Sequence, residues 1–237
     1  MKKMVKFFGI IAFSSIIGFT LASCDNGTGN GGNNGGNGVG NNISLGTRLS
    51  LSGPTYLISL ITRFYGDVDV QAVTWNNGSA IPIGAGTGAI SGGQLNFIID
   101  SPPAHVLGEI FAGNPSINIS PAATRLHTLD LYILGRYRLL LYHMVPTATS
   151  YNDRVLMFIY SDRPATISSK GHESYFEFGG RYTRNYQNAF NISLQQGWNA
   201  IHSATTRTDT ATGRTNIHTI SPDSAANRAG LRWFLDM

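Results

Sequence analysis

Side chains that could act as nucleophiles, acids, bases or metal ligands are few in this chain of 237 residues. It contains one cysteine, six histidines, ten aspartates and three glutamates. A single cysteine excludes a disulfide within the chain, so the fold must be stable without such a cross-link. Cys24 is the one thiol, and the segment around it decides which chemistry that thiol can undergo.

The histidines do not have the spacing of a metal site. They are His105, His127, His143, His172, His202 and His218. No pair follows the H-x-x-x-H pattern, and no further thiolate is available to complete a ligand set. His202 and His218 could face each other if the threonine-rich stretch 205–219 folds as a hairpin, but histidines on strand surfaces are the simpler interpretation. We expect neither a metal nor a cofactor.

The carboxylates give little indication of catalysis. Asp67 and Asp69 would share one strand face, and glycosidases need two positioned carboxylates. Both lie beside a turn, however, where aspartate is common for conformational reasons. No serine stands in a G-x-S-x-G elbow, and the glycines of 84–88 precede a hairpin rather than a helix, unlike a phosphate-binding loop. We assign no catalytic residue and favour a non-catalytic role.

Aromatic and arginine side chains crowd into residues 175–186. The candidate binding residues there are Tyr175, Arg181, Tyr182, Arg184 and Tyr186, with Phe176 and Phe178 beside them. Aromatic faces and guanidinium groups can stack on and hydrogen-bond to a sugar or a peptide. The alternative is that alternate aromatics fill a core while arginines cover a strand edge. Exposure of Tyr182 and Tyr186 on a concave face would favour binding, and an interior position would favour packing.

The N-terminus is organised like an export signal. Lys2, Lys3 and Lys6 precede fifteen residues, 7–21, that carry no charge and are mostly apolar. A charged region followed by an apolar region of this length is typical of a signal peptide. A membrane-spanning helix needs about 20 apolar residues, so this segment is too short to be one. We therefore expect residues 1–23 to be removed on export.

The sequence Leu21-Ala22-Ser23-Cys24 resembles the lipobox of bacterial lipoproteins. In that family the cysteine thiol receives diacylglycerol, the bond before it is cut, and the new amine is usually acylated, with palmitate as a representative chain. The resemblance implies a lipid on Cys24 and stable anchoring by two or three acyl chains. A plain signal peptide with an incidental cysteine is the alternative, but the only thiol stands where the lipobox requires it.

Removal of the signal would change the charge of the protein. The whole chain has 17 basic and 13 acidic side chains, and loss of three lysines leaves 14 basic ones. A near-neutral chain gives no reason to expect nucleic acid as a partner. After the lipidated Cys24, residues 25–42 contain eight glycines and seven asparagines. Residues 24–42 are thus expected to be a disordered tether, with a root-mean-square span of roughly 23 Å.

Alternation of apolar and polar residues dominates the remainder, 43–237. It is clearest in 94–100, 129–133, 190–194 and 231–236, where the apolar sets are Leu95, Phe97, Ile99; Leu129, Leu131, Ile133; Phe190, Ile192, Leu194; and Leu231, Trp233, Leu235. Two stretches, 139–142 and 155–160, are apolar on both faces and are expected to be central strands. The pattern predicts about ten to twelve strands.

Turn and helix signals separate these strands. Gly92-Gly93 suits a two-residue hairpin, and Asn76-Asn77-Gly78 and Gln195-Gln196-Gly197 mark other strand ends. The best helix candidate is 222–229, with Ser221 as its N-cap and Gly230 after its end. A weaker candidate lies around 104–111.

The order of elements favours one fold class. Helices and strands do not alternate, so a doubly wound sheet is not expected. We predict an all-β fold, an antiparallel two-sheet sandwich or a barrel-like form, with at most one or two short helices. Residues 43–237 are expected to form a single domain, and two small sheets divided near 146–152 are the alternative.

Three stretches resemble uncharacterised, β-rich bacterial lipoproteins of the kind abundant in spirochaetes. They are the lipobox with its Asn/Gly tail, residues 88–97 (GAISGGQLNF), and residues 194–199 (LQQGWN) followed by Leu231-Arg232-Trp233. The resemblance implies a lipid-anchored β-sandwich and carries over no catalytic residue.

These observations lead to an expected function. We expect an exported, non-catalytic binding or interaction protein, held by the lipid on Cys24 at the outer membrane and cell surface or at a periplasmic face. Its partners would be the membrane and a protein or glycan ligand, and the residues specify no oligomeric state. One alternative is a hydrolase of envelope glycans, which needs a pocket with convergent acids and bases. The other is a purely structural envelope component without a ligand.

The anchor gives a direct prediction. Replacement Cys24→Ala removes the thiol that would carry the lipid, so the protein should leave the membrane fraction for the aqueous fraction. Fractionation of cells followed by immunoblotting measures this distribution. Continued residence of the variant in the membrane fraction would show that Cys24 is not the anchor.

Overall fold

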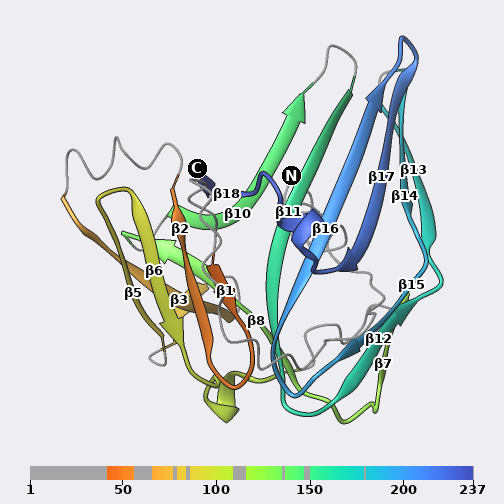
Figure 1. Ribbon diagram of the computed structural model, residues 1–237. Helices are drawn as coiled ribbons and strands as arrows, with labels where there is room; N and C mark the ends of the chain where they lie inside the picture. Colours follow the sequence, from red (N-terminus) through yellow and green to blue (C-terminus); the bar gives the residue numbers. More distant parts are fainter. Residues whose placement is uncertain are drawn as a thin grey trace, which may run out of the picture.

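The fold consists almost entirely of strands. The structure is a computed structural model that describes residues 42–55, 66–76, 79–83, 86–108, 116–134, 137–146, 150–178 and 180–236. In these residues fifteen strands form one sheet and three form a second (Figure 1). The large sheet is not closed into a barrel along the described strands. The predicted all-β fold with two sheets is confirmed, with more strands than the ten to twelve expected.

The large sheet runs in the order β1-β2-β6-β5-β3-β9-β10-β11-β16-β17-β14-β13, and β4, β8 and β18 pair with β3, β11 and β10. Its strands are β1 (Asn42–Ser44), β2 (Leu49–Pro54), β3 (Val68–Asn76), β4 (Ser79–Pro82), β5 (Gly86–Ser91), β6 (Gln94–Ile99), β8 (Leu126–Thr128), β9 (Asp130–Ile133), β10 (Tyr137–Pro146), β11 (Ser150–Ser161), β13 (His172–Phe178), β14 (Arg181–Gln187), β16 (Gly197–Asp209), β17 (Gly213–Pro222) and β18 (Arg232–Asp236). The small sheet contains β7 (Ile117–Ser120), β12 (Ala165–Ser169) and β15 (Phe190–Leu194).

Two long strands occupy the centre of the molecule. β11 pairs with β16 over twelve consecutive positions, from Ser150 opposite Thr208 to Ser161 opposite Gly197. Along β11, Leu156 and Phe158 enter the larger core on one face, while Ile159 enters the smaller core on the other. The prediction that 155–160 is covered on both faces is confirmed.

The larger core lies between the two halves of the large sheet. Strands β10, β11, β16 and β18 contribute one wall, and β2, β3, β5, β6 and β9 contribute the other. The predicted alternation in β6 is confirmed, because Leu95, Phe97 and Ile99 are all buried. Trp198 on β16 forms hydrogen bonds between the two walls. Its backbone N–H donates to Gly46 O, between β1 and β2, at 2.7 Å, and its Nε1 donates to Asp100 O, just after β6, at 3.2 Å.

The smaller core lies on the opposite face of the central strands. There the small sheet packs with Ile167, Phe190, Ile192 and Leu194 against Ile201 and its neighbours. The predicted alternation of β15 is confirmed by its burial pattern. The molecule thus has three layers, and the central strands belong to the middle one (Figure 1).

The predicted alternation in 129–133 is wrong. Asp130 and Tyr132 were expected on a polar face, but they are only 8% and 9% exposed. β9 has a hydrogen-bonded neighbour on each edge, β3 and β10, and both of its faces are covered. Arg138 Nε donates to Asp130 Oδ1 at 2.7 Å, which stabilises the buried carboxylate.

The turns agree with the sequence better than the helices do. Gly92 and Gly93 have φ of 55° and 76° and form the predicted two-residue hairpin between β5 and β6. The helix α3 (Ala225–Arg228) is shorter than predicted, and Ser224 rather than Ser221 caps it, accepting from Asn227 N at 3.1 Å. Ser221 and Pro222 belong to β17, whose pairing with β16 extends that far. The second candidate is a 3-10 turn, η1 (Ala104–Val106).

One long hairpin belongs to both sheets. β12 continues into β13 after residues 170–171, and β14 continues into β15 after residues 188–189. The β12 and β15 halves pair in the small sheet, while the β13 and β14 halves pair in the large sheet, where β14 joins β17 in parallel. This crossing places the predicted aromatic segment at the outer edge of the large sheet.

The predicted signal, Cys24 and nearly all of the predicted tether lie outside the described residues. Asn42, the last residue assigned to the tether, belongs to β1 instead, because it pairs with Ser52. Among the residues that the structure describes, no helix is both long enough and apolar enough to cross a membrane.

Packing of Phe97 against Gly86 and Gly88 gives a prediction about the stability of the fold. A Cβ on Gly88 would lie 2.6 Å from Phe97 Cδ2 and 2.5 Å from Asn96 O. Gly88→Ala should therefore destabilise the fold by about 1–3 kcal/mol, as overpacked substitutions do. Urea unfolding monitored by circular dichroism measures the change in free energy of unfolding. The matched control is Gly108→Ala, because a Cβ there has nothing within 4 Å, and equal effects of the two changes would contradict the explanation.

A buried histidine gives a prediction about acid stability. His127 is 2% exposed, its Nε2 has no hydrogen-bond partner in the described part of the chain, and its ring packs edge-on against Trp198. Burial lowers the pKa of His127 to about 4, against the opposing charge of Asp130 and a hydrogen bond with the Val106 backbone. The unfolded chain binds this proton more readily, so the neutral ring stabilises the fold fully above pH 6.5 or so and progressively less as the pH falls towards 4.

His127→Phe keeps a ring of similar size and removes the titrating group. The free energy of unfolding should fall less between pH 7 and pH 4.5 in the variant than in the wild type, by about 2–3 kcal/mol. Urea titrations of both proteins at the two pH values give the difference. An equal fall in the free energy of unfolding in the variant and the wild type would show that His127 does not contribute to acid sensitivity.

Candidate ligand-binding surface

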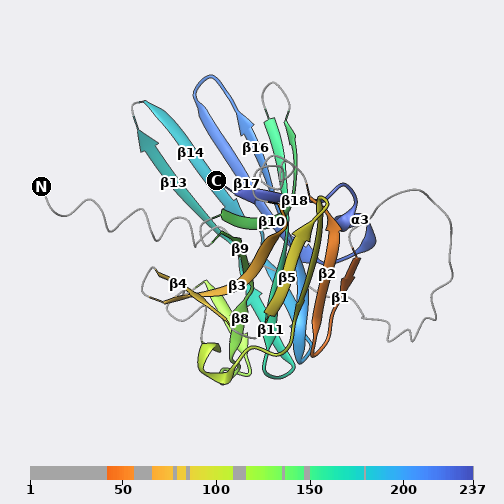
Figure 2. The ribbon, with the colours of Figure 1, turned by 90° about the vertical axis from the view of Figure 1, so that its left-hand side faces the viewer.

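The predicted binding residues lie on a part of the large sheet that extends beyond both cores. We call this part the plate, and it consists of residues 150–155, 172–178, 181–187, 204–209 and 213–218. Its described side chains belong to neither hydrophobic core. Figures 1 and 2 show the hairpins β13–β14 and β16–β17 extending, together with β10 and β11, to the same end of the molecule. The plate therefore presents two broad faces and one free strand edge.

Strand register decides which side chains share a face. Tyr175 on β13 is opposite Arg184 on β14, and Arg184 is in turn opposite Thr215 on β17. Thr215 is opposite Thr208 on β16. Paired residues point to the same face of a sheet and successive residues to opposite faces. One face, the aromatic face, thus carries Tyr175, Tyr182, Arg184 and Tyr186 together with Glu173 and Glu177. By the same alternation, Arg181 belongs to the reverse face.

Two tyrosines and an arginine form the centre of the aromatic face. The rings of Tyr175 and Tyr182 are stacked, with centroids 6.2 Å apart and an interplanar angle of 20°. Arg184 Cζ lies 5.9 Å from the Tyr175 centroid and 5.4 Å from that of Tyr182, within reach of a cation–π interaction with either ring. A hydrogen bond with Tyr186 is the main reason why the pKa of Arg184 is raised. These contacts pre-order the four predicted side chains.

A glycine provides the space for Tyr182. A Cβ on Gly213 would lie 2.8 Å from Tyr182 Cγ and 2.4 Å from Tyr182 O, so no larger residue fits there without movement. Thr212 Oγ1 donates to the Tyr182 hydroxyl at 3.3 Å. Hydrogen bonds with Thr212 and then with Thr210 lower the pKa of Tyr182. The ring is thus supported from beneath and held at its tip.

Exposure divides the predicted residues into two groups. Tyr175, Arg181 and Arg184 are exposed, with Tyr175 at 55%, whereas Tyr182 and Tyr186 are half-buried. None of the five is interior. The structure therefore gathers Tyr175, Tyr182, Arg184 and Tyr186 on one accessible face and leaves Arg181 out.

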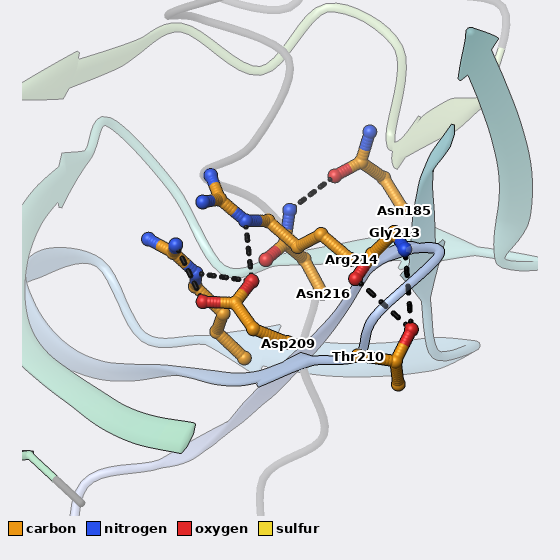
Figure 3. Close-up of polar contacts among 7 residues, drawn as sticks. Asn185, Asp209, Thr210, Gly213, Arg214 and Asn216 are labelled. Carbon is orange, nitrogen blue, oxygen red and sulfur yellow. Dashed lines mark hydrogen bonds and ion pairs between the residues drawn. The ribbon is translucent and has the colours of Figure 1, made fainter. Parts of the chain in front are cut away.

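The reverse face carries a network that the sequence analysis missed (Figure 3). Asp209 Oδ2 accepts from Arg207 Nη2 at 2.6 Å, and Asp209 Oδ1 accepts from Arg207 Nε at 3.1 Å and from Arg214 Nε at 2.8 Å. Arg207 Cζ lies 5.0 Å from the ring centroid of Tyr151. Asn216 Nδ2 donates to Asn185 Oδ1 at 2.8 Å. We call this the polar face.

A specific sequence signal could have found the polar face. The turn at 210–213 closes with Gly213 N donating to Thr210 Oγ1 at 3.2 Å, drawn in Figure 3. Counting outward from that turn places Asp209 opposite Arg214 and Arg207 opposite Asn216. In the sequence these charged residues stand between threonines, which dominate the composition of 205–219.

Burial shows how the plate is curved. On the polar face every described side chain of β11, β16 and β17 within the plate is half-buried, although no core residue covers it. On the aromatic face the same strands expose Asn152, Thr206, Thr208 and Ile217. Side chains on the inside of a curved sheet crowd one another, so the plate curves towards the polar face. The aromatic face is therefore convex, not the concave surface that would have favoured binding most strongly.

The two histidines of the hairpin formed by the threonine-rich stretch are not brought together. The threonine-rich stretch does fold as the β16–β17 hairpin, but His202 is opposite Ser221 and His218 is opposite Thr205, which places them on different faces. His202 is 5% exposed, so its expected position on a strand surface is wrong. Asp67 and Asp69 are both exposed. No group of three or more His, Cys, Asp or Glu able to hold a metal occurs among the described residues.

Comparison of the chain with models of protein families, with curated proteins and with solved structures finds no match. Function is therefore inferred from the chemistry of the plate itself.

Proposed function

We propose that this chain is a lipid-anchored, non-catalytic binding protein of the bacterial cell envelope. The lipobox-like segment at Cys24 and the Gly/Asn-rich tether support the anchor. A tether with a root-mean-square span of roughly 23 Å lets the folded part meet a ligand without packing on the membrane. The plate supplies the binding surface.

The exposure of two neighbouring aromatic side chains carries the proposal. Tyr175 is 55% exposed on the aromatic face, and Phe176 is 62% exposed on the polar face of the same strand. Among the exposed large hydrophobic side chains of the described residues, these two have the largest exposed fractions. On the aromatic face, Tyr175 also stacks on Tyr182, and an exposed apolar patch of this kind marks an interaction site. A purely structural component would gain from burying these rings or from replacing them with polar residues.

The aromatic face has the chemistry of a recognition surface. The Tyr175 and Tyr182 rings offer faces on which a peptide or a sugar ring can stack. Arg184 offers guanidinium donors beside them, which suit a carbonyl or carboxylate oxygen of the ligand. Glu173 and Glu177 are exposed on the same face and provide acceptors. Binding would therefore combine stacking with charge-assisted hydrogen bonds.

A binding experiment tests this proposal. The purified lipidated protein, held in detergent micelles, is incubated with cell-envelope fragments from the same bacterium, and co-sedimentation is measured. The double variant Tyr175→Ala, Arg184→Ala should bind at least about tenfold more weakly, because aromatic and arginine side chains dominate the binding energy of most interfaces. Treating the fragments with protease beforehand distinguishes a protein ligand from a glycan.

Ile98→Ala is the matched control. Ile98 is 44% exposed on β6, in the other half of the molecule, and its loss should leave binding unchanged. Equal binding by the wild type and the Tyr175, Arg184 double variant would refute the aromatic face as the ligand surface.

A further inference from the structure

The outermost strand of the plate has one free edge. β13 ends the large sheet, with β14 as its only strand neighbour among the described strands. A strand at a sheet edge presents backbone N–H and C=O groups that another strand can pair with. β13 is seven residues long and contains no proline, so nothing in its backbone prevents such pairing.

The register identifies the outward-facing backbone groups. Tyr182 N donates to Thr212 O, so the backbone of Tyr182 faces β17 and not β13. In an antiparallel pair hydrogen-bonded and non-hydrogen-bonded positions alternate, and Tyr182 is opposite Glu177. The N–H and C=O groups of Glu177, and equally of Tyr175 and Glu173, therefore point away from β14. No described residue supplies them with a partner.

An occupant of this edge would explain why both faces of β13 expose a ring. A ligand lying on the aromatic face alone would leave Phe176 in water, because Phe176 points to the polar face. An extended chain paired with β13 has side chains on both faces and would cover Tyr175 and Phe176 together. We infer that β13 is a strand-addition site for an extended polypeptide that carries basic residues.

The charge of the edge selects the basic partner. Glu173 and Glu177 stand on the same face, four residues apart, and both are exposed. A paired strand places its own side chains directly opposite them, where opposite charges stabilise the pair and like charges destabilise it. The fitting segment thus has Lys or Arg at two positions four residues apart, with apolar residues between them to cover the rings.

The same charges disfavour a second copy of this chain. An antiparallel pairing of the whole stretch 173–177 with itself places Glu173 opposite Glu177 in both directions. Acidic residues on an edge strand are a known means of preventing self-association. Pairing of β13 with β13 of a second copy is therefore disfavoured, while pairing with a basic segment is favoured.

This inference rests on the proposed function and names the partner of the same surface as a polypeptide. It uses a binding mode in which main-chain hydrogen bonds supply affinity and alternate side chains supply specificity. Its test must therefore separate edge pairing from stacking on the aromatic face.

Two synthetic peptides serve as probes for the purified lipidated protein in detergent. The basic probe is Ac-Thr-Lys-Val-Tyr-Val-Lys-Thr-NH2, and the acidic probe has Glu in place of both Lys residues. Fluorescence anisotropy of labelled peptides should show the basic probe binding about tenfold or more tightly, since two favourable charge pairs replace two repulsive ones. The double variant Glu173→Lys, Glu177→Lys should reverse this preference.

A backbone variant tests the pairing itself. Glu177→Pro removes an outward N–H without removing a hydrogen bond to β14, a change that edge strands tolerate. It should weaken binding of the basic probe at least about fivefold relative to Glu177→Ala, which removes the same charge but keeps the N–H. Circular dichroism spectra of the two variants check that both are folded.

Three outcomes would overturn the strand-addition site. They are equal binding of the two probes, equal binding of the basic probe by the Glu177→Pro and Glu177→Ala variants, and dimerisation of the wild type that Glu177→Pro abolishes. If the basic probe fails to bind while the Tyr175, Arg184 double variant still loses binding to envelope fragments, the proposed function stands and only the strand-addition site is refuted.

Discussion

The pairing of β11 with β16 is the constraint on which the rest of the structure depends. Twelve consecutive residue pairs hold these strands in one register. Both faces of the strands carry side chains that build either a core or a face of the plate. At one end the faces build the two cores, through Phe158 on one side and Ile159 on the other. At the other end the same register carries the chain beyond the cores and sets the two faces of the plate. A slip of one residue would turn the side chains of the larger core towards the smaller core and would exchange the two faces of the plate.

The plate illustrates how a sheet without a covering layer can remain ordered. It lacks the apolar burial that stabilises the other strands, and cross-strand side-chain pairs replace it. The convex side uses ring stacking between Tyr175 and Tyr182, and the concave side uses the shared carboxylate of Asp209 between Arg207 and Arg214. Consequently Tyr175, Tyr182 and Arg184, which we propose as ligand-binding residues, also contact one another across the strands of the plate.

Sequence patterns predicted the parts of this fold that depend on local rules. Alternation in β6 and β15 and the Gly92-Gly93 turn were correct because each depends on residues close in sequence. The errors come from tertiary context. Asp130 is buried because both faces of β9 are covered, and Ser221 is not a cap because pairing with β16 continues β17 as far as Pro222. For the candidate site, sequence identified the aromatic side chains but not the Arg207 network, whose members meet only after the hairpin is formed.

The position of β18 has a consequence for the order in which this protein can be completed. β18 pairs with β10, and its Trp233, 1% exposed, fills the larger core, whose other wall is built from β2, β3, β5, β6 and β9. Until residues 232–236 are available, the larger core therefore lacks Trp233, and the edge of β10 that β18 covers is unpaired. Because non-local contacts of this kind form slowly, completion of the larger core should be a late step in folding.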